Sequence, residues 1–496
     1  MRWANFLHFY QPVNQQADIL EAIIAQSYRP IISEIKRNPK VRLTLNISGA
    51  LLELLHKYGH QDLIDDLRGL VAEERIEITG TAKYHALLPL VSEKEAIRQI
   101  ELDTEALQKF LNIPSPAGFF PPEMAFSRKL LPLLEKLGFR WVVLDEISSG
   151  GDVGQVDYSQ IYKIKNSKLK IFFRDRRLSN LIMSAVVRSK ETLREAMQRE
   201  ISSPNYVVTA MDAETFGHHR PGLEKMLFQI WETEDFEQVK ISDLENSYEV
   251  KKEILPGEAT WASSKEDIER GIQFLSWKDP ENIIHKWQWE FTELTLGEVY
   301  RMDENHPRFP LVREKMDAAL ASDHFWWASA KPWWSLEMIE YGAWNLLDTL
   351  RFIPDVSQEA LEKGRSYYEK IISTAFNWQR TGKIRMMMQE QNKILRIPFK
   401  DRTVGRGGAE RGVYHAFLDM MAELEKKGAK TGEYEKAILW RDAIYKLKEK
   451  LDIYDTINAI DLLRVAIPHK EVEETIEKYK DKYRSLRGGQ PEQRGS

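Results

Sequence analysis

Two carboxylates lie two residues apart in the stretch TAMDAETFGHH, residues 209–219, directly after an apolar run at 206–208. They are Asp212 and Glu214. So much polar chemistry at the end of a buried strand is either an ordinary solvated turn or part of a catalytic site. The catalytic interpretation requires a partner carboxylate elsewhere in the chain.

The best partner is Glu123, in the stretch GFFPPEMAFS at 118–127. It follows two prolines, which stiffen the loop, and it has Phe120 and Phe126 as near neighbours in the sequence. Aromatic surroundings and a second carboxylate both shift a carboxyl pKa, and acid–base and nucleophilic catalysis use such shifts. Taken alone, Glu123 is equally compatible with an exposed loop.

Short apolar runs alternate with amphipathic stretches in the first half of the chain, which predicts a parallel sheet built from βαβ units. Helices are expected at 19–38, 49–56 and 92–111, the last opened by a Ser92–Glu95 capping box. Strands are expected at 3–8, 41–47, 76–79, 117–120, 141–144, 169–173, 206–210 and 239–242. This many units favours a closed (β/α) barrel over an open sheet.

Polar residues follow almost every predicted strand, and the carboxyl ends of barrel strands meet at one mouth. We therefore expect a shared site there. The residues concerned are His8, Tyr10, Gln11, those at 80–85, Glu123, Asp145, Glu146, Asp175, Arg176, Asp212 and Glu214. The arginines around Asp175 are expected either to brace the barrel, which we favour, or to form an ion-pair network at its mouth.

From about residue 265 the pattern becomes helical, with spacing typical of amphipathic helices at 336–351, 358–372, 414–426, 434–451 and 457–467. The predicted organisation is a catalytic barrel at 1–265, a helical region completing the active site at 266–485, and a flexible tail at 486–496. The tail is expected to be frayed because it lacks apolar residues.

The composition limits the possible functions. The chain has 496 residues, 43% hydrophobic and 30% charged residues, a net charge of −5 and no cysteine. These values are typical of a soluble globular protein and give no support for nucleic-acid binding. The sequence start does not resemble a signal peptide, and no apolar run is long enough to span a membrane, so we expect a cytoplasmic location. The oligomeric state stays open.

Fourteen tryptophans are present, several of them paired in sequence, as at 326–327 and 333–334. Tryptophan most often packs in a core or an interface. Paired tryptophans in loop-like sequence also suit the flat apolar faces of sugar rings.

Five motifs in this order resemble those of glycoside hydrolase family 57, whose members act on α-glucans. They are HFYQP (8–12), GTAKYHALLP (80–89), GFFPPEMAFS (118–127), TAMDAETFGHH (209–219) and SDHFWW (322–327). The resemblance implies a distorted (β/α)7 barrel followed by a mainly helical region, so one of our strand candidates is expected to be wrong or peripheral.

The resemblance further implies a retaining enzyme that cleaves α-1,4-glucosidic bonds of starch-like glucans or maltodextrins by double displacement, without metal or organic cofactor. Glu123 would be the nucleophile and Asp212 the general acid and base. The implied substrate-binding residues are His8, Gln11, His85, Phe120, Glu214, His219, Asp323 and Trp326.

Several of these residues also have a structural interpretation. His8 could be a hydrogen-bonded core histidine, Glu214 an exposed neighbour, and Asp323 a helix N-cap. Adjacent His218 and His219 are poorly spaced to hold one metal and are typical of a loop.

Three positions depart from the family pattern. Tyr10 stands where the family usually has a second histidine, His85 where it often has glutamate, and Phe120 where many members have tryptophan. Tyr10 can hydrogen-bond but carries no charge near neutral pH. These changes leave the chemistry intact and affect the expected subsite preference.

Other functions fit less well. A 4-α-glucanotransferase or branching enzyme would differ only in the acceptor of the glycosyl group. A metal-dependent polysaccharide deacetylase would need an aspartate and two histidines around a metal. A non-catalytic glucan-binding relative would not need both carboxylates. The Gly- and Arg-rich stretch 402–412 lacks the residues of a phosphate-binding loop, and we expect a surface loop there.

Overall fold

The computed structural model describes residues 1–183, 189–197, 201, 203–331, 333–388, 411–448, 459–460, 462–463, 466–467, 471–472 and 474–479. The chain divides into two compact units. The first comprises Met1–His218 and Leu227–Met388, and the second comprises His219–Met226 and Gln389–Ser496. The predicted tail at 486–496 and most of the 402–412 stretch lie outside the described residues.

One five-stranded sheet of the first unit has the order β3-β2-β1-β8, with β9 also paired to β1, and all its pairs are parallel. Apolar residues fill the inner strands, as expected when both faces of a parallel sheet are covered. Its strands are β1 (Arg2–Phe9), β2 (Leu43–Ile47), β3 (Ile76–Thr79), β8 (Tyr206–Asp212) and β9 (Glu237–Gln238).

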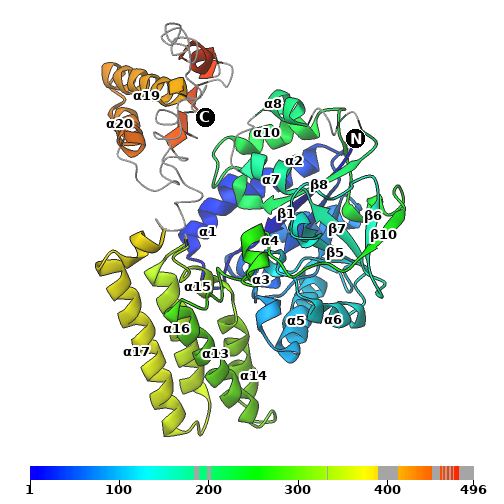
Figure 1. Cartoon of the computed structure of the whole chain (residues 1–496), viewed down its shortest axis with the longest axis vertical. Helices are drawn as coiled ribbons and strands as arrows, with labels where there is room; N and C mark the ends of the chain where they lie inside the picture. Colours follow the sequence, from blue (N-terminus) through cyan, green and yellow to red (C-terminus); the bar gives the residue numbers. More distant parts are fainter. Residues whose placement is uncertain are drawn as a thin grey trace, which may run out of the picture. The chain divides into compact units, whose positions relative to one another are not determined.

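The second five-stranded sheet has the order β10-β6-β7-β5-β4 and is parallel except for the pair of β6 and β7. Figure 1 shows helices of the same unit on both sides of the sheets, with β6 and β10 at the outer edge. The strands are β4 (Gly118–Phe119), β5 (Trp141–Asp145), β6 (Ile161–Ile164), β7 (Lys170–Arg174) and β10 (Val250–Ile254).

The two sheets contact each other at two places. An isolated parallel bridge joins Gly80 to Phe119, between β3 and β4. On the other side the Asp175 amide donates to the Val208 carbonyl at 2.8 Å, between β7 and β8. The α/β class and the helical C-terminal region are confirmed, but the strands of the described residues form two sheets and not the closed barrel that we predicted.

The predicted helices of the first half are present, although the stretch expected at 19–38 consists of two α-helices joined by a π-helical turn, Ile24–Tyr28. Helices of this half are α1 (Ala17–Ile23), α2 (Arg29–Arg37), α3 (Gly49–Lys57), α4 (Gln61–Ala72), α5 (Glu93–Leu111), α6 (Leu131–Lys136), α7 (Arg176–Met183), α8 (Lys190–Ala196), α10 (Leu223–Trp231), α11 (Ile241–Leu244) and α12 (Lys265–Glu269).

The second half is helical, as predicted. Figure 1 shows α13, α14, α16 and α17 running side by side in the first unit. The helices are α13 (Ile283–Arg301), α14 (Phe309–Ala319), α15 (Asp323–Trp326), α16 (Leu336–Phe352) and α17 (Gln358–Arg380), with α19 (Arg411–Thr431) and α20 (Tyr434–Lys448) in the second unit. The helix expected at 457–467 falls mostly outside the described residues. No helix in the described ranges combines the length and apolarity needed to cross a membrane.

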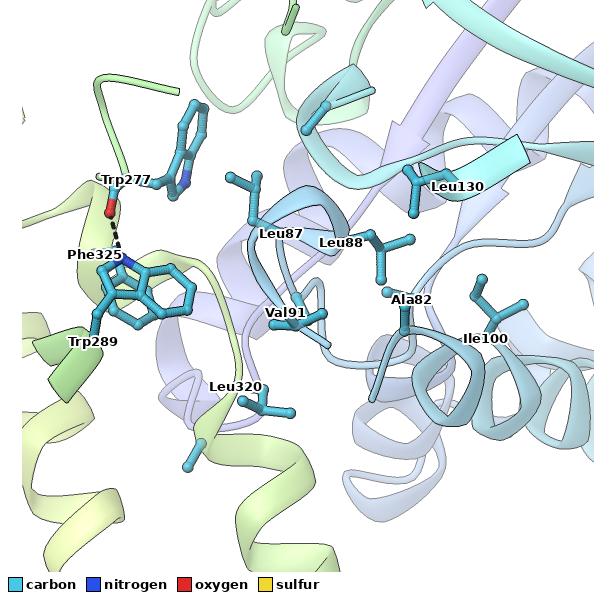
Figure 2. Packing of buried hydrophobic residues seen from close by; sticks show 14 of the residues in the cluster. Ala82, Leu87, Leu88, Val91, Ile100, Leu130, Trp277, Trp289, Leu320 and Phe325 are labelled. Atoms are coloured by element: carbon cyan, nitrogen blue, oxygen red, sulfur yellow. Dashed lines mark hydrogen bonds between the residues drawn. The ribbon is translucent and has the colours of Figure 1, made fainter. Parts of the chain in front are cut away.

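One hydrophobic core joins the α/β part of the first unit to its helical part. It includes Leu87 and Leu88 from the loop after β3 together with Trp289 and Phe325 from the helical part. The Trp289 ring stacks on Phe325 at 4.2 Å, and its indole N–H donates to the Trp277 carbonyl at 2.9 Å (Figure 2). The start of α15 is tied to the loop after β3 by the Ser322 amide, which donates to the His85 carbonyl at 3.3 Å.

The strand expected at 239–242 is wrong, because β9 ends at Gln238 and Ile241–Leu244 is helical. Strands β6 and β10 were missed. β10, with the sequence VKKEI, is mostly exposed, so it lacks the apolar run that revealed the inner strands. The Ser92 hydroxyl caps α5 as predicted, whereas the Glu95 side chain does not close the capping box and instead pairs with Arg313.

Candidate active site

A row of polar side chains crosses the first sheet at the carboxyl ends of its strands. His8 of β1 is the register partner of Asp212 of β8 on one side and of Asn46 of β2 on the other. Asn46 is in turn the partner of Thr79 of β3. Register partners in a parallel sheet present their side chains to the same face, so the sheet itself brings Asp212 beside His8.

His8 is buried and its orientation is fixed by Asn46. The distance from His8 Nδ1 to Asn46 Oδ1 is 2.7 Å, and the Asn46 amide donates to the Thr79 hydroxyl at 3.1 Å. Asn46 Oδ1 can therefore only accept, so Nδ1 of His8 carries the proton and Nε2 is an acceptor. Burial lowers the pKa of His8 to about 4, so the ring is neutral above that pH.

Glu123 lies on the loop after β4, in a short helical turn, Pro122–Met124. Its φ is +61°, a left-handed conformation that a non-glycine residue adopts only when its surroundings impose it. The Trp261 indole N–H donates to Glu123 Oε2 at 2.7 Å, and His85 Nε2 lies 4.0 Å from Glu123 Oε1. Burial and then the charge of Asp212 raise the pKa of Glu123 to about 8, although the Trp261 hydrogen bond lowers it.

Asp212 and Glu214 lie close enough for their charges to interact. Burial raises the pKa of Asp212, while the positive charge of Arg174 lowers it. Burial and the charge of Asp212 raise the pKa of Glu214. Glu214 is buried, not the exposed neighbour of the structural interpretation, and it accepts hydrogen bonds from Tyr28 and, at 2.8 Å, from Gln11.

Tyr10 contacts both Asp323 and His85. The Tyr10 hydroxyl donates to Asp323 Oδ2 at 2.6 Å, and the Tyr10 ring stacks on His85 with centroids 4.1 Å apart. His85 Nδ1 lies 3.0 Å from the Ser322 hydroxyl, and its Nε2 is buried without a hydrogen-bond partner. Burial lowers the pKa of His85 well below its ordinary value, and burial raises the pKa of Asp323 to about 6.

The structure brings most of the predicted residues together: hydrogen bonds, ring contacts and charge interactions link His8, Gln11, His85, Glu123, Asp212, Glu214 and Asp323. Asp323 is the first residue of α15, and Ser322 occupies the N-cap position.

Three predicted substrate-binding residues have other surroundings. Phe120 is fully buried and packs under His8 and Trp261, so it supports those rings. Trp326 stacks on Trp333 at 4.3 Å. His219 belongs to the stretch grouped with the second compact unit.

The arginine-rich stretch forms ion pairs at the strand ends, which fits both of the roles considered for it. Arg174 and Arg176 both pair with the buried Asp145 carboxylate, each at 2.8 Å. Arg174 also donates to the Ala210 carbonyl at 2.8 Å, two residues before Asp212. The same arginine therefore holds the end of β8 and places a positive charge near Asp212.

Two residues of the site were missed. Trp261 follows the last predicted strand and has no recognisable motif around it. Tyr28 lies in a stretch with a helical pattern, and nothing in that pattern predicts that its hydroxyl belongs to the site. Only the fold brings their donors to Glu123 and Glu214. Within the described part of the chain, no group of three or more histidine, aspartate or glutamate side chains is arranged to hold a metal ion.

Comparison with known proteins gives several related sequences. An α-amylase from Pyrococcus horikoshii is 23% identical over 241 residues, which are 48% of this chain and 37% of that protein. A 4-α-glucanotransferase from Thermococcus kodakarensis is 29% identical over 153 residues, covering 29% of this chain and 22% of that protein. The chain thus spans well under half the length of these relatives.

Solved structures show the same fold at low identity. A branching enzyme of this family from Thermococcus kodakaraensis aligns with a TM-score of 0.56 and 16% identity, covering 74% of this chain and 94% of that one. A 4-α-glucanotransferase from Thermococcus litoralis aligns with a TM-score of 0.55 and 17% identity, covering 71% of this chain and 58% of that one. The sequence model of the family itself matches residues 3–255, a little over half of the chain. The chain belongs to glycosyl hydrolase family 57.

Proposed function

We propose that this chain is a retaining glycosidase that cleaves α-1,4-glucosidic bonds in starch-like glucans or maltodextrins. Glu123 is the nucleophile and Asp212 is the general acid and base. The observation that supports this most strongly is their electrostatic interaction: the charge of Asp212 raises the pKa of Glu123 within one cluster of polar side chains. Two carboxyls that interact in this way beside hydrogen-bonding side chains suit a double displacement at one anomeric carbon.

In the first step Asp212 gives its proton to the glycosidic oxygen while Glu123 attacks the anomeric carbon. The bond to the leaving sugar breaks, and a glycosyl ester forms on Glu123. In the second step Asp212 takes a proton from water or from a sugar hydroxyl, whose oxygen attacks the same carbon and releases Glu123. This geometry needs a separation of roughly 5–5.5 Å between the two carboxyl groups.

The roles require Glu123 to be ionised while Asp212 is protonated. Burial raises the pKa of both groups, the charge of Asp212 raises the pKa of Glu123 further, and the charge of Arg174 opposes the rise at Asp212. Without substrate, electrostatics therefore favours the proton on Glu123. The assignment of roles rests on the two motifs and on the Trp261 N–H, which stabilises the carboxylate form of Glu123. A chemical experiment can identify the nucleophile directly.

The neutral side chains around Glu123 and Asp212 bind the hydroxyl groups of the substrate. His8 Nε2 is an acceptor, His85 Nε2 has no hydrogen-bond partner among the described residues, and Gln11 holds Glu214 in place. Asp323 supplies a carboxylate from the helical part of the first unit, which supports a role of that part in completing the site. The two contacts between the sheets support a distorted, interrupted form of the (β/α)7 barrel around it.

Trapping of the covalent intermediate tests the proposal. A 5-fluoro-α-maltosyl fluoride should label the wild-type chain once, because fluorine destabilises both transition states while fluoride leaves readily. Peptide mass spectrometry should place the adduct on Glu123, and Glu123→Gln should not be labelled. An adduct on Asp212 would reverse the two roles, and a folded wild-type protein that never labels would refute the mechanism.

The acceptor is a separate question, because hydrolysis and transfer share the first step. Maltotriose incubated with the wild-type protein gives only shorter sugars if water is the acceptor. Longer oligomers would identify a 4-α-glucanotransferase, and new α-1,6 linkages detected by NMR would identify a branching enzyme.

A further inference from the structure

The side chain of Trp261 contacts one oxygen of the Glu123 carboxyl group. Its indole N–H donates to Oε2 at 2.7 Å, whereas Oε1 is on the side of His85, 4.0 Å from Nε2. The two oxygens therefore have different surroundings. Oε2 is held by a neutral donor, and Oε1 is left to approach a substrate atom.

The backbone fastens the same two segments to each other. The Trp261 amide donates to the Glu123 carbonyl at 3.1 Å, and the Phe126 amide donates to the Ala259 carbonyl at 2.9 Å. Phe126 and Ala259 form an antiparallel bridge. These bonds help to hold Glu123 in its left-handed conformation, which an unsupported loop would abandon.

The segment that carries Trp261 is itself fixed from the opposite side. Arg176 donates to the Ser263 carbonyl at 2.7 Å while pairing with Asp145. The Ser263 hydroxyl accepts from the Thr260 amide at 2.8 Å. The indole position is therefore built into the fold and does not depend on a mobile surface side chain.

Neighbouring rings and one cation restrict the indole further. Phe120 and His8 meet it edge to face at 5.9 and 6.3 Å, and the Arg174 guanidinium lies 5.9 Å from its ring centroid. A donor locked in this way costs no reorganisation when the charge of its acceptor changes.

Given the proposed function, we infer that Trp261 is a positioning residue for the nucleophile: its N–H orients the Glu123 carboxylate and stabilises it both before attack and as the leaving group of the second step. A hydrogen bond to a charged carboxylate is stronger than one to a neutral ester. Trp261 therefore favours ionisation of Glu123 against burial and the charge of Asp212, and it favours breakdown of the glycosyl ester.

Trp261→Phe is the test, because it removes the N–H and keeps an aromatic ring. The rate of labelling by 5-fluoro-α-maltosyl fluoride falls at low pH, where Glu123 becomes protonated. In Trp261→Phe this fall, the acid limb of the pH profile, should begin at a higher pH. Release of the trapped sugar should slow roughly tenfold to a hundredfold. Trp141→Phe is the matched control, because Trp141 donates its N–H to Ser242 at 3.2 Å in the same α/β part of the protein. It should keep the wild-type pH profile.

The outcomes separate the two proposals. A wild-type protein that does not label overturns the proposed function. A wild-type protein that labels, together with a folded Trp261→Phe whose acid limb and release rate are unchanged, overturns the role of Trp261.

A second measurement covers a Trp261→Phe protein that fails to fold. In wild-type protein containing 5-fluorotryptophan, the Trp261 19F resonance should shift as Glu123 titrates, and this shift should vanish in Glu123→Gln. A Trp261 resonance whose chemical shift stays constant while Glu123 titrates overturns the inference.

Discussion

His8 and Asp212 are register partners on adjacent parallel strands, β1 and β8. Their proximity is set by the sheet ladder and needs no loop closure. On its other side His8 is held by Asn46, also a register partner. The proposed acid therefore stands beside a neutral, oriented imidazole whose free nitrogen accepts hydrogen bonds.

Replacing His8 with phenylalanine should lower kcat/KM roughly tenfold to a hundredfold, because a buried acceptor for a substrate hydroxyl is lost. The loss should be the same from pH 5 to 8, since burial lowers the pKa of His8 to about 4 and the ring stays neutral across this range. Rates on a maltooligosaccharide at several pH values measure it. Asn46→Ala removes only the hydrogen bond that orients the His8 ring, so it should lower kcat/KM less than His8→Phe does. A deficit that grows below pH 6.5 would contradict a neutral His8.

Tyr10→Phe should raise KM roughly tenfold with a smaller effect on kcat. The phenylalanine keeps the stacking on His85 but removes the hydrogen bond that orients Asp323 and lowers its pKa. Tyr10→Leu, which loses the stacking as well, should be more impaired. Steady-state kinetics on both variants provide the comparison. A Tyr10→Phe protein with wild-type KM would show that Asp323 does not depend on this bond.

Glu123→Gln should stabilise the protein at pH 8–9 and have little effect near pH 4. The pKa of Glu123 is raised to about 8 in the folded protein, so between its unfolded value and pH 8 the folded state binds more protons than the unfolded state. Wild-type stability must then fall as pH rises through this window, by up to roughly 5 kcal/mol from this group. Glutamine removes that dependence.

Thermal unfolding of wild type and Glu123→Gln as a function of pH checks the sign. Glu101→Gln, on the exposed face of α5, is the control and should follow the wild-type curve. A Glu123→Gln protein that is less stable than wild type at pH 9 would be incompatible with a destabilising buried carboxylate.

Arg313→Met should destabilise the first unit by roughly 3–5 kcal/mol, because Arg313 pairs with Glu95 and Asp317, which are 0% and 1% exposed. The pair with Glu95 joins α5 of the α/β part to α14 of the helical part, whereas Asp317 lies on α14 itself. Urea unfolding measures the loss. Adding Glu95→Gln to Arg313→Met should recover part of it, since the Glu95 charge is gone while Asp317 keeps its ion pair with Arg98. Equal stability of Arg313→Met and wild type would show that the pair contributes nothing.

Much of the fold follows from local sequence. The inner strands β1, β2, β3, β5, β7 and β8 are apolar runs bounded by polar residues, and the long helices have clear amphipathic spacing. Strand β10 was not predicted because an exposed strand lacks this pattern. The stretch 239–242 was wrongly predicted as a strand because a short apolar run does not distinguish a strand from a helical turn.

The sequence by itself indicated the family and the candidate residues: two carboxylates at strand ends, their histidine neighbours, and the five motifs. Only the tertiary structure showed that Trp261 donates to Glu123, that Tyr28 donates to Glu214, and that Tyr10 reaches Asp323 across the junction with the helical region. Strand periodicity is a local property, and neighbouring residues encode it. Hydrogen bonds between residues more than a hundred positions apart depend on how the elements pack, and no short stretch of sequence contains that information.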